Sequence, residues 1–341
     1  MTLPALLLLV AGVLLGVGVP WLGMRMLTPS LRLSEKAQAT NYRGRSVFYG
    51  LGVVWLIWAG CAIIGGVLAA SLVSASVLPI LTLAGPLALV AFALGAVDDA
   101  YGSGSDRGFK GHLKAMARGR LTTGGMKLVG IGLASLLVAG VLSGMAPWAG
   151  GETGGATVVR VLATLVAGAA IALTSNLFNL LDLRPGRALK SYALLSPLAL
   201  ASTAIGLSIA AGWSAARGVE GAALDAVVLG LFLIGPFVAV YRYDLGEEGM
   251  LGDAGANPMG AVVGLLIVSG LPLVPLLVWT ALVVVLNLAS ERVSFSAVIE
   301  GTTALRWLDG LGRLADLPKG TELEDGVDAS DREERHTHEN S

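Results

Sequence analysis

The chain has 341 residues, of which 55% are hydrophobic and only 14% are charged, and its formal net charge is -1. This composition excludes an ordinary soluble globular domain and is typical of a polytopic membrane protein. The single cysteine, Cys61, excludes an intramolecular disulfide and a cysteine-based metal cluster. We therefore expect an all-α fold, a polytopic bundle of transmembrane helices.

Uncharged stretches predict about nine membrane spans, with a range of eight to ten, because roughly 20 apolar residues cross the hydrocarbon core as a helix. The uncharged run 46–97 is too long for one helix and turns near Pro79, and the run 254–290 breaks at 269–272. The expected spans are Leu3–Met24, two helices within 46–97, 128–151, 157–180, 191–216, a short helix 226–241 and two helices within 254–290.

Lys and Arg favour the cytoplasmic side of short loops, and this rule predicts the orientation of the chain. With the N-terminus outside, nine spans place 21 of the 23 Lys and Arg residues inside and leave only Arg160 and Arg217 outside. The C-terminal tail is then cytoplasmic. The same topology brings acidic residues of three separate loops to the cytoplasmic face, namely Asp98, Asp99, Asp182, Asp244, Glu247, Glu248 and Asp253.

Three segments with different properties follow one another along the chain. Residues 1–290 form the predicted transmembrane domain. In 291–315, leucines at three-residue spacing between charged residues predict an amphipathic helix on the cytoplasmic surface. Residues 316–341 hold nine of the 24 acidic residues and have no apolar periodicity, which predicts a disordered acidic tail.

Two acidic motifs lie where long uncharged runs meet a polar loop. Asp98 and Asp99 end the run that begins at residue 46, and ionisable groups at such a boundary are functional candidates. Asp253 lies in the glycine-rich segment Gly249–Gly255, where small residues allow a phosphate or a metal ion to approach the backbone. An isolated aspartate pair could equally be a solvated helix end.

A third motif, Asn176-Leu-Phe-Asn179-Leu-Leu-Asp182, places three polar side chains on one helix face, because each step of three residues advances about 300°. Asn176 could instead form a hydrogen bond between helices, and the lone His112 is expected to be a solvated loop residue. Carboxylates and amides beside Lys and Arg are the ligand chemistry of Mg²⁺ and phosphate. We therefore expect one cation and phosphate site assembled from loops of the bundle.

Taken in order, these motifs resemble a known family, the polyprenyl-phosphate N-acetylhexosamine-1-phosphate transferases, which includes the MraY translocase and the WecA-type enzymes. The resemblance covers about residues 20–290. It rests on Asp98–Asp99, on the N-x-x-N-x-x-D motif ending at Asp182, on Gly252-Asp253-Ala254-Gly255, on Asn41–Gly44, which looks like the family's first cytoplasmic loop, and on Lys127, which matches a lysine after the aspartate pair.

The resemblance implies transfer of a sugar-1-phosphate from a UDP-sugar to a polyprenyl phosphate in cell-envelope polymer synthesis, with release of UMP and a requirement for Mg²⁺. The implied partners are the polyprenyl phosphate, the UDP-sugar and the membrane, with no nucleic acid, and a homodimer is left open. The implied roles are metal binding by Asp253 with Asp98 or Asp99, catalysis by Asp98 or Asp99, and substrate binding by Asn176, Asn179, Asp182 and Lys127.

Two departures from the family pattern support an alternative. Asp182-Leu-Arg-Pro185-Gly186 stands where the family reads D-G-x-D-G, and residues 287–313 contain no histidine where the family has a histidine-rich loop. The alternative is a non-catalytic relative that binds a lipid phosphate or scaffolds envelope assembly. A secondary transporter is a third candidate, disfavoured because the acids gather at one face and not at the membrane midplane.

Overall fold

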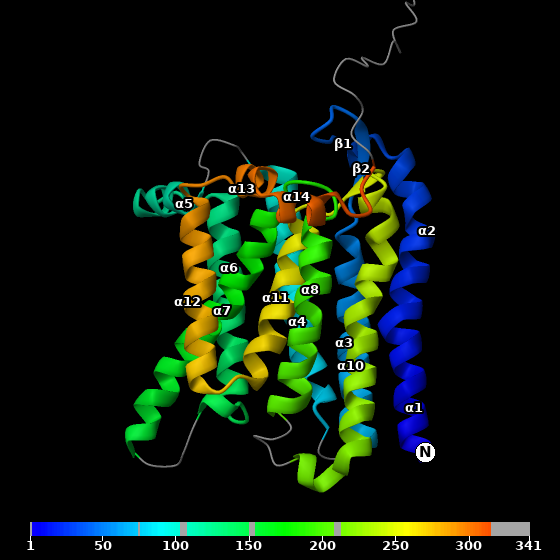
Figure 1. Ribbon diagram of the computed structural model, residues 1–341, viewed down its shortest axis with the longest axis vertical. Helices are drawn as coiled ribbons and strands as arrows, with labels where there is room; N and C mark the ends of the chain where they lie inside the picture. The colour runs from blue at the N-terminus through cyan, green and yellow to red at the C-terminus, as the bar shows by residue number, and fades with distance from the viewer. Residues whose placement is uncertain (1, 74–75, 103–107, 150–153, 208–212, 315–341) are drawn as a thin grey trace, which may run out of the picture.

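The computed structural model describes residues 2–73, 76–102, 108–149, 154–207 and 213–314. Its long helices run side by side along one axis (Figure 1), which confirms the expected all-α polytopic bundle. Within these residues, eight helices are long and apolar enough to cross a membrane: Leu3–Leu33, Val53–Leu72, Leu78–Tyr101, Thr123–Leu142, Thr157–Leu181, Arg187–Gly206, Gly218–Leu245 and Leu273–Ser290. The acidic tail predicted over 316–341 lies outside the described residues.

The helices begin and end close to the uncharged runs. In chain order they are α1 (Leu3–Ala11), which continues through a π-helical stretch (Gly12–Gly18) into α2 (Val19–Leu33), then α3 (Val53–Leu72), α4 (Leu81–Tyr101), α5 (Gly108–Ala117), α6 (Thr123–Leu142), α7 (Gly154–Leu181), α8 (Arg187–Ala201) with a π-helical end (Ser202–Leu207), α10 (Trp213–Leu245), α11 (Asp253–Gly270), α12 (Leu273–Ser290), α13 (Phe295–Gly301) and α14 (Thr303–Gly310).

Some expected spans have other bounds, since Leu3–Met24 continues to Leu33 and 128–151 is Thr123–Leu142. Two further elements differ more. The short span predicted over 226–241 is the 28-residue helix Gly218–Leu245, because Asp225, taken as a flank, is buried inside the bundle. Its carboxylate accepts hydrogen bonds from Ser76 Oγ at 3.1 Å and from the Val77 amide at 3.0 Å. The single surface helix predicted over 291–315 is two short helices, because the chain is extended at Thr302, with φ -107° and ψ 116°.

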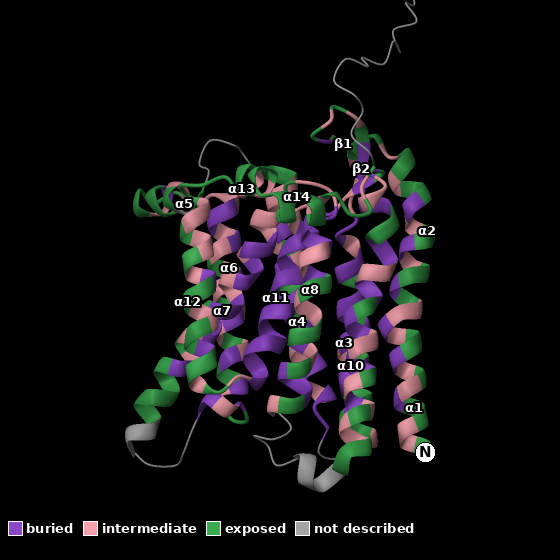
Figure 2. Ribbon diagram, viewed as in Figure 1, coloured by how far each residue is buried: buried purple, intermediate pink, exposed green. Residues whose placement is uncertain are grey.

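α11 is the central helix of the bundle. Every residue from Ala254 to Gly270 is buried, and its ribbon is enclosed by the other helices (Figure 2). Small residues permit this close packing, since a Cβ at Gly260 would lie 2.6 Å from the carbonyl oxygen of Thr174 in α7. α11 is not among the eight apolar helices named above, and its burial shows that other helices surround it in this bundle.

A small sheet joins two loops at one end of the bundle. β1 (Gln38–Thr40) pairs antiparallel with β2 (Ser46–Tyr49), and β2 pairs parallel with β3 (Gly249–Met250). The register sets Tyr49 opposite Met250. α5, α13 and α14 lie at this same end (Figure 1). Segments far apart in sequence therefore meet beside the first residues of α11.

Candidate functional site

Two of the three sequence motifs meet at one ammonium group. Lys127 Nζ lies 2.9 Å from Asp98 Oδ2 and also contacts Asp253 Oδ2. The three side chains come from α6, from the end of α4 and from the start of α11. The Lys127 side chain keeps only 10% of its surface exposed, so water screens these contacts weakly. The charges sum to one negative charge.

Asp99 has a different environment from its neighbour Asp98. Its two carboxylate oxygens accept hydrogen bonds from the backbone amides of Asp253, at 3.0 Å, and Ala254, at 2.8 Å. The first amides of a helix have no partner within the helix, and a carboxylate there satisfies them and favours the positive end of the helix dipole. Asp99 therefore holds the start of α11 in place and so positions Asp253.

Close packing brings the start of α11 up to α4 and β2. A Cβ at Gly95, one turn before Asp99, would overlap the carbonyl group of Asp253. Gly252 has φ 64° and ψ -172°, a conformation that essentially only glycine adopts, and a Cβ there would overlap the hydroxyl group of Tyr49. Burial, and next the charge of Asp99, raise the pKa of Tyr49, so its hydroxyl stays protonated beside that carboxylate.

Asp182 follows the last residue of α7 and lies on the same loop cluster. It is half-buried, and the Gly252 amide hydrogen-bonds to its carboxylate. Burial, followed by the negative charges of Asp244, Asp253 and Asp99, raises the pKa of Asp182 well above its ordinary value. Asp182 is thus close enough to Asp253 to sense its charge.

A cavity of about 390 Å³ opens beside Lys127. Its polar lining includes four amide side chains and three ionisable ones: Asn176, Asn179, Asn257, Asn287, His112, Lys127 and Glu291. The rest of the wall is mainly apolar and includes Leu128, Ile131, Leu173, Val284 and Leu288 from α6, α7 and α12. The cavity therefore combines a polar lining with a hydrocarbon wall that belongs to membrane-spanning helices.

The asparagines of the N-x-x-N-x-x-D motif have different surroundings from its aspartate. Asn176 and Asn179 line the cavity, whereas Asp182 does not. Asn176 Nδ2 donates to Asn287 Oδ1 at 2.7 Å. Asn176 thus forms the interhelical hydrogen bond that the sequence left open, between α7 and α12, and it also lines the cavity.

Several residues of the site carry no motif in the sequence. Asn257 lines the cavity, and its Nδ2 donates to the Asp253 carbonyl at 2.8 Å. Asn257 lies four residues after Asp253, so the helical spacing could have placed both residues on one helix face. Tyr49, Asn287 and His112 had no comparable signal, and His112 is half-buried beside the cavity instead of solvated.

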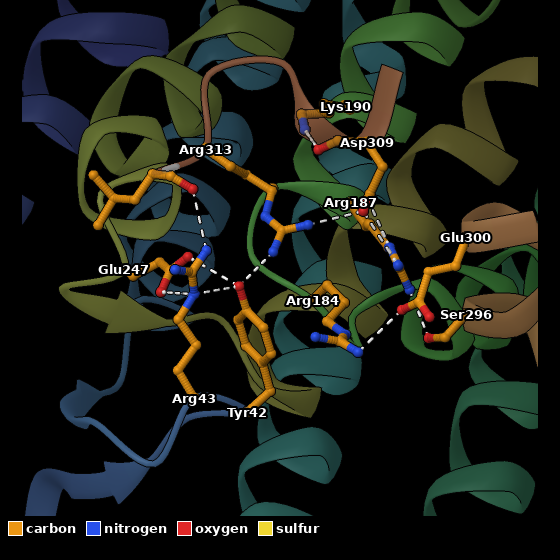
Figure 3. A network of polar contacts seen from close by, with 12 residues as sticks. Tyr42, Arg43, Arg184, Arg187, Lys190, Glu247, Ser296, Glu300, Asp309 and Arg313 are labelled. Atoms are coloured by element: carbon orange, nitrogen blue, oxygen red, sulfur yellow. Dashed lines mark hydrogen bonds and ion pairs between the residues drawn. The ribbon is translucent and has the colours of Figure 1, made fainter. Parts of the chain in front are cut away.

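A second polar network fixes the C-terminal segment at this end of the bundle (Figure 3). Arg187, which is buried, binds both carboxylate oxygens of Asp309, at 2.7 Å and 3.2 Å, and donates to Ser296 Oγ at 2.7 Å. Arg313 pairs with Asp309 at 2.9 Å. Burial alone would raise the pKa of Asp309, but the hydrogen bonds and charge of Arg187, with the charge of Arg313, hold it below its ordinary value.

Tyr42 lies at the edge of the same network (Figure 3). The guanidinium carbon of Arg184 lies 4.2 Å from the centre of its ring. Arg43 donates to the Leu314 carbonyl at 3.1 Å and pairs with Glu247 at 3.0 Å. The loop after α7, the Asn41–Gly44 segment and the C-terminal segment are thus one connected surface.

The carboxylates beside Lys127 are candidate ligands for a divalent cation. Among the residues that the structure describes, no group of three or more His, Cys, Asp or Glu side chains is arranged to hold a metal ion. Asp98 and Asp253 nevertheless each direct an oxygen to one positive group, the Lys127 ammonium. Two converging carboxylates at a water-accessible site fit Mg²⁺, which commonly takes one or two protein carboxylates and otherwise water or phosphate oxygens.

No family model and no curated protein sequence matches this chain.

Proposed function

We propose that the protein transfers a sugar-1-phosphate from a UDP-sugar to a polyprenyl phosphate, with release of UMP, at the cytoplasmic face of the cell membrane. The observation that carries the proposal is the convergence of Asp98, Lys127 and Asp253 beside a cavity with a hydrocarbon wall. Cation-binding and phosphate-binding groups at such a place suit a reaction between a soluble phosphate donor and a lipid phosphate acceptor.

The cavity suits an amphiphile. A lipid phosphate placed near the Lys127 ammonium would leave its chain against Leu128, Ile131 and Val284. Burying the apolar chain there supplies binding free energy of roughly 25 cal/mol per Å² of apolar surface removed from water. The asparagines Asn176 and Asn179 supply amide groups in the same lining for the phosphates or the nucleoside of the donor, and Asp182 lies near Asp253 on the other side of the loop cluster.

The transfer itself needs little covalent chemistry from the protein. An oxygen of the lipid phosphate attacks the sugar-bearing phosphorus of the UDP-sugar, the bond from that phosphorus to the bridging oxygen breaks, and UMP leaves with the bridging oxygen. Asp98 orients the attacking phosphate. If that phosphate carries a proton, Asp98 accepts it. Lys127 neutralises phosphate charge, and Asp99 keeps Asp253 in place. Such a reaction is accelerated mainly by positioning and electrostatic stabilisation.

Asp253 and Asp98 are the residues that would hold Mg²⁺. Bound there, the ion supplies positive charge to the diphosphate oxygens. Lys127, which contacts both carboxylates, would then be free to bind phosphate.

The deciding assay uses the purified protein in lipid nanodiscs with Mg²⁺, undecaprenyl phosphate and a panel of UDP-sugars, and follows UMP release. We expect turnover with at least one donor, and its loss when EDTA removes the metal. Asp253→Asn should abolish turnover in a folded protein. Glu248→Gln should retain it, because Glu248 is an exposed carboxylate at the same end that pairs with Arg32. Turnover by Asp253→Asn equal to wild type would refute the metal assignment.

A second function is favoured by one specific observation. Lys127 already forms ion pairs with both Asp98 and Asp253. Arg187, in the segment where the family's second aspartate is absent, is paired with Asp309. A non-catalytic relative that binds lipid phosphate would need no more than this. Binding of undecaprenyl phosphate without UMP release from any donor would identify that function. The clustering of the acids at one end argues against a transporter.

A further inference from the structure

The short helix α5 closes one side of the cavity. Gly108 and His112 of this helix line it, together with Gly124 at the start of α6 and Glu291 after the end of α12. A Cβ at Gly108 would lie 2.9 Å from Glu291 Oε1, so the beginning of α5 is in contact with the end of α12. The motifs that support phosphosugar transfer assign no role to α5.

His112 is held in place through one of its two ring nitrogens. Nδ1 lies 2.8 Å from Thr122 Oγ1, and this hydroxyl also accepts the Gly125 amide at 3.0 Å as the N-cap of α6. Within the described residues, Nε2 has no hydrogen-bond partner. The ring is therefore fixed at the cavity with one polar atom unused.

Gly124 makes room for the imidazole. A Cβ at this position would lie 2.5 Å from Nε2 and would also overlap Cε1. The edge of the ring that carries Nε2 thus packs over a cavity-lining glycine, and any larger residue there would displace the ring. Two positions, His112 and Gly124, control the placement of one nitrogen.

The surroundings of this nitrogen are basic apart from one carboxylate. α5 contains Lys110 and Lys114 and no acidic residue, and Arg118 follows it, although these three residues do not line the cavity and Glu291 does. Lys127 lines the same cavity. A phosphate oxygen is the anion that the polar lining suits, and apolar residues of α6, Leu128 and Ile131, continue the wall. This favours a phosphate that carries a hydrocarbon chain over the soluble nucleotide.

We propose that His112 is a further binding residue for the phosphate group of the lipid acceptor, to which Nε2 forms a hydrogen bond. The identity of the lipid as a polyprenyl phosphate rests on the proposed function, whereas the role of His112 does not depend on turnover. Thr122 orients the ring, and Gly124 admits it to the cavity wall.

The test measures equilibrium binding of two lipids to the full chain in nanodiscs by isothermal titration calorimetry. Undecaprenyl phosphate carries the phosphate, and undecaprenol has the same chain without it. His112→Ala should weaken binding of undecaprenyl phosphate roughly tenfold or more, the usual contribution of a hydrogen bond to a charged group. It should leave binding of undecaprenol unchanged. His112→Gln keeps an N–H donor and should recover part of the loss.

Two further variants separate the contact from the fold of α5. Gly124→Ala should cause a similar phosphate-dependent loss although the histidine is present. Leu113→Ala removes an exposed side chain of the same helix and should change neither affinity. Equal weakening of both lipids by His112→Ala would overturn the proposal, because the ring would then act through packing. An effect confined to UDP-sugar binding would also overturn it.

These outcomes are independent of the assay for transfer. A wild-type protein that releases no UMP, yet binds undecaprenyl phosphate more tightly than undecaprenol through His112, retains the proposed phosphate contact and loses only the enzymatic function. A wild-type protein that turns over but whose affinity is the same after His112→Ala retains the enzymatic function and loses the contact.

Discussion

Asp98 and Asp99 are adjacent, but their substitutions should affect different properties. Asp99→Ala should mainly lower stability, whereas Asp98→Ala should mainly lower turnover. In Asp99→Ala, the backbone amides of Asp253 and Ala254 lose the carboxylate that accepts both of them. A buried donor without a partner costs about 1–3 kcal/mol, and loss of an N-cap costs about 0.5–2 kcal/mol. Because Asp99 is half-buried and water can replace part of the interaction, we expect a loss of about 2–4 kcal/mol for the two amides together.

Asp98→Ala removes one partner of Lys127 and leaves the other, Asp253. The three charges sum to one negative charge, so the substitution leaves a neutral pair and no isolated buried ion. Because Lys127 keeps Asp253 as a partner, the expected loss of stability is that of one hydrogen bond, about 0.5–1.5 kcal/mol. Turnover, in contrast, should be lost, because in the proposed reaction Asp98 would orient the lipid phosphate and share the cation.

The free energy of unfolding of both variants can be measured by SDS titration in mixed micelles, with helix content followed by circular dichroism. Asp99→Asn is the matched intermediate, since its single amide oxygen accepts one of the two amides and should lose about half as much. Equal destabilisation by Asp98→Ala and Asp99→Ala, or a larger effect of Asp98→Ala, would refute the separation of roles.

Three further outcomes are expected. Gly252→Ala should be destabilised by more than the strain of about 1–3 kcal/mol for its backbone conformation, since its Cβ also overlaps the ring and hydroxyl of Tyr49. Gly252→Ala combined with Tyr49→Ala, compared with Tyr49→Ala alone, should show the backbone strain without the overlap. Gly132→Ala, with open space around it, should be neutral or stabilised by about 0.5–1 kcal/mol. Arg187→Ala should release α14 from the ion pair between Arg187 and Asp309 and increase the rate of tryptic cleavage within α14. An unchanged cleavage rate would contradict the role of this ion pair. Because the pKa of Asp309 is lowered in the folded protein, its ion pairs stabilise the fold fully above the ordinary pKa of about 3.9. This stabilisation is lost as pH falls through the lower folded pKa. A spin-label distance between α8 and α14 should lengthen in that pH range, and Asp309→Asn should remove this pH dependence.

Much of the fold was predictable because lipid imposes a simple length and charge rule. The break at 269–272 follows from glycine and proline, and α11 and α12 meet there. The rule failed at Asp225, which it treated as a solvated flank. A buried carboxylate can lie within a span when it accepts hydrogen bonds from a neighbouring loop, here Ser76 and Val77, and that partner is not visible in the local sequence.

The site was predictable as a set of residue types and less so as a set of roles. The sequence grouped Asp98, Asp99 and Asp253 correctly in space, but the task of Asp99 depends on backbone amides, which carry no sequence signal. His112 lies in a basic helix whose spacing gives no reason to place it beside Lys127. Its position follows from the contact of α5 with Gly124 and Glu291, which only tertiary packing establishes.

The buried position of α11 constrains how the chain is assembled in the membrane. α11 carries Asp253 and Asn257 in its first two turns, is buried along its length, and is not among the eight most apolar helices of the described residues. Polar residues near a helix end make independent transfer into lipid unfavourable. Its neighbours α4 and α7 precede it in the chain, so the helices against which α11 packs are already synthesised when it emerges. The loop that carries Asp253 is therefore set in place only after α4 and α7, and incomplete chains that end before it have no site.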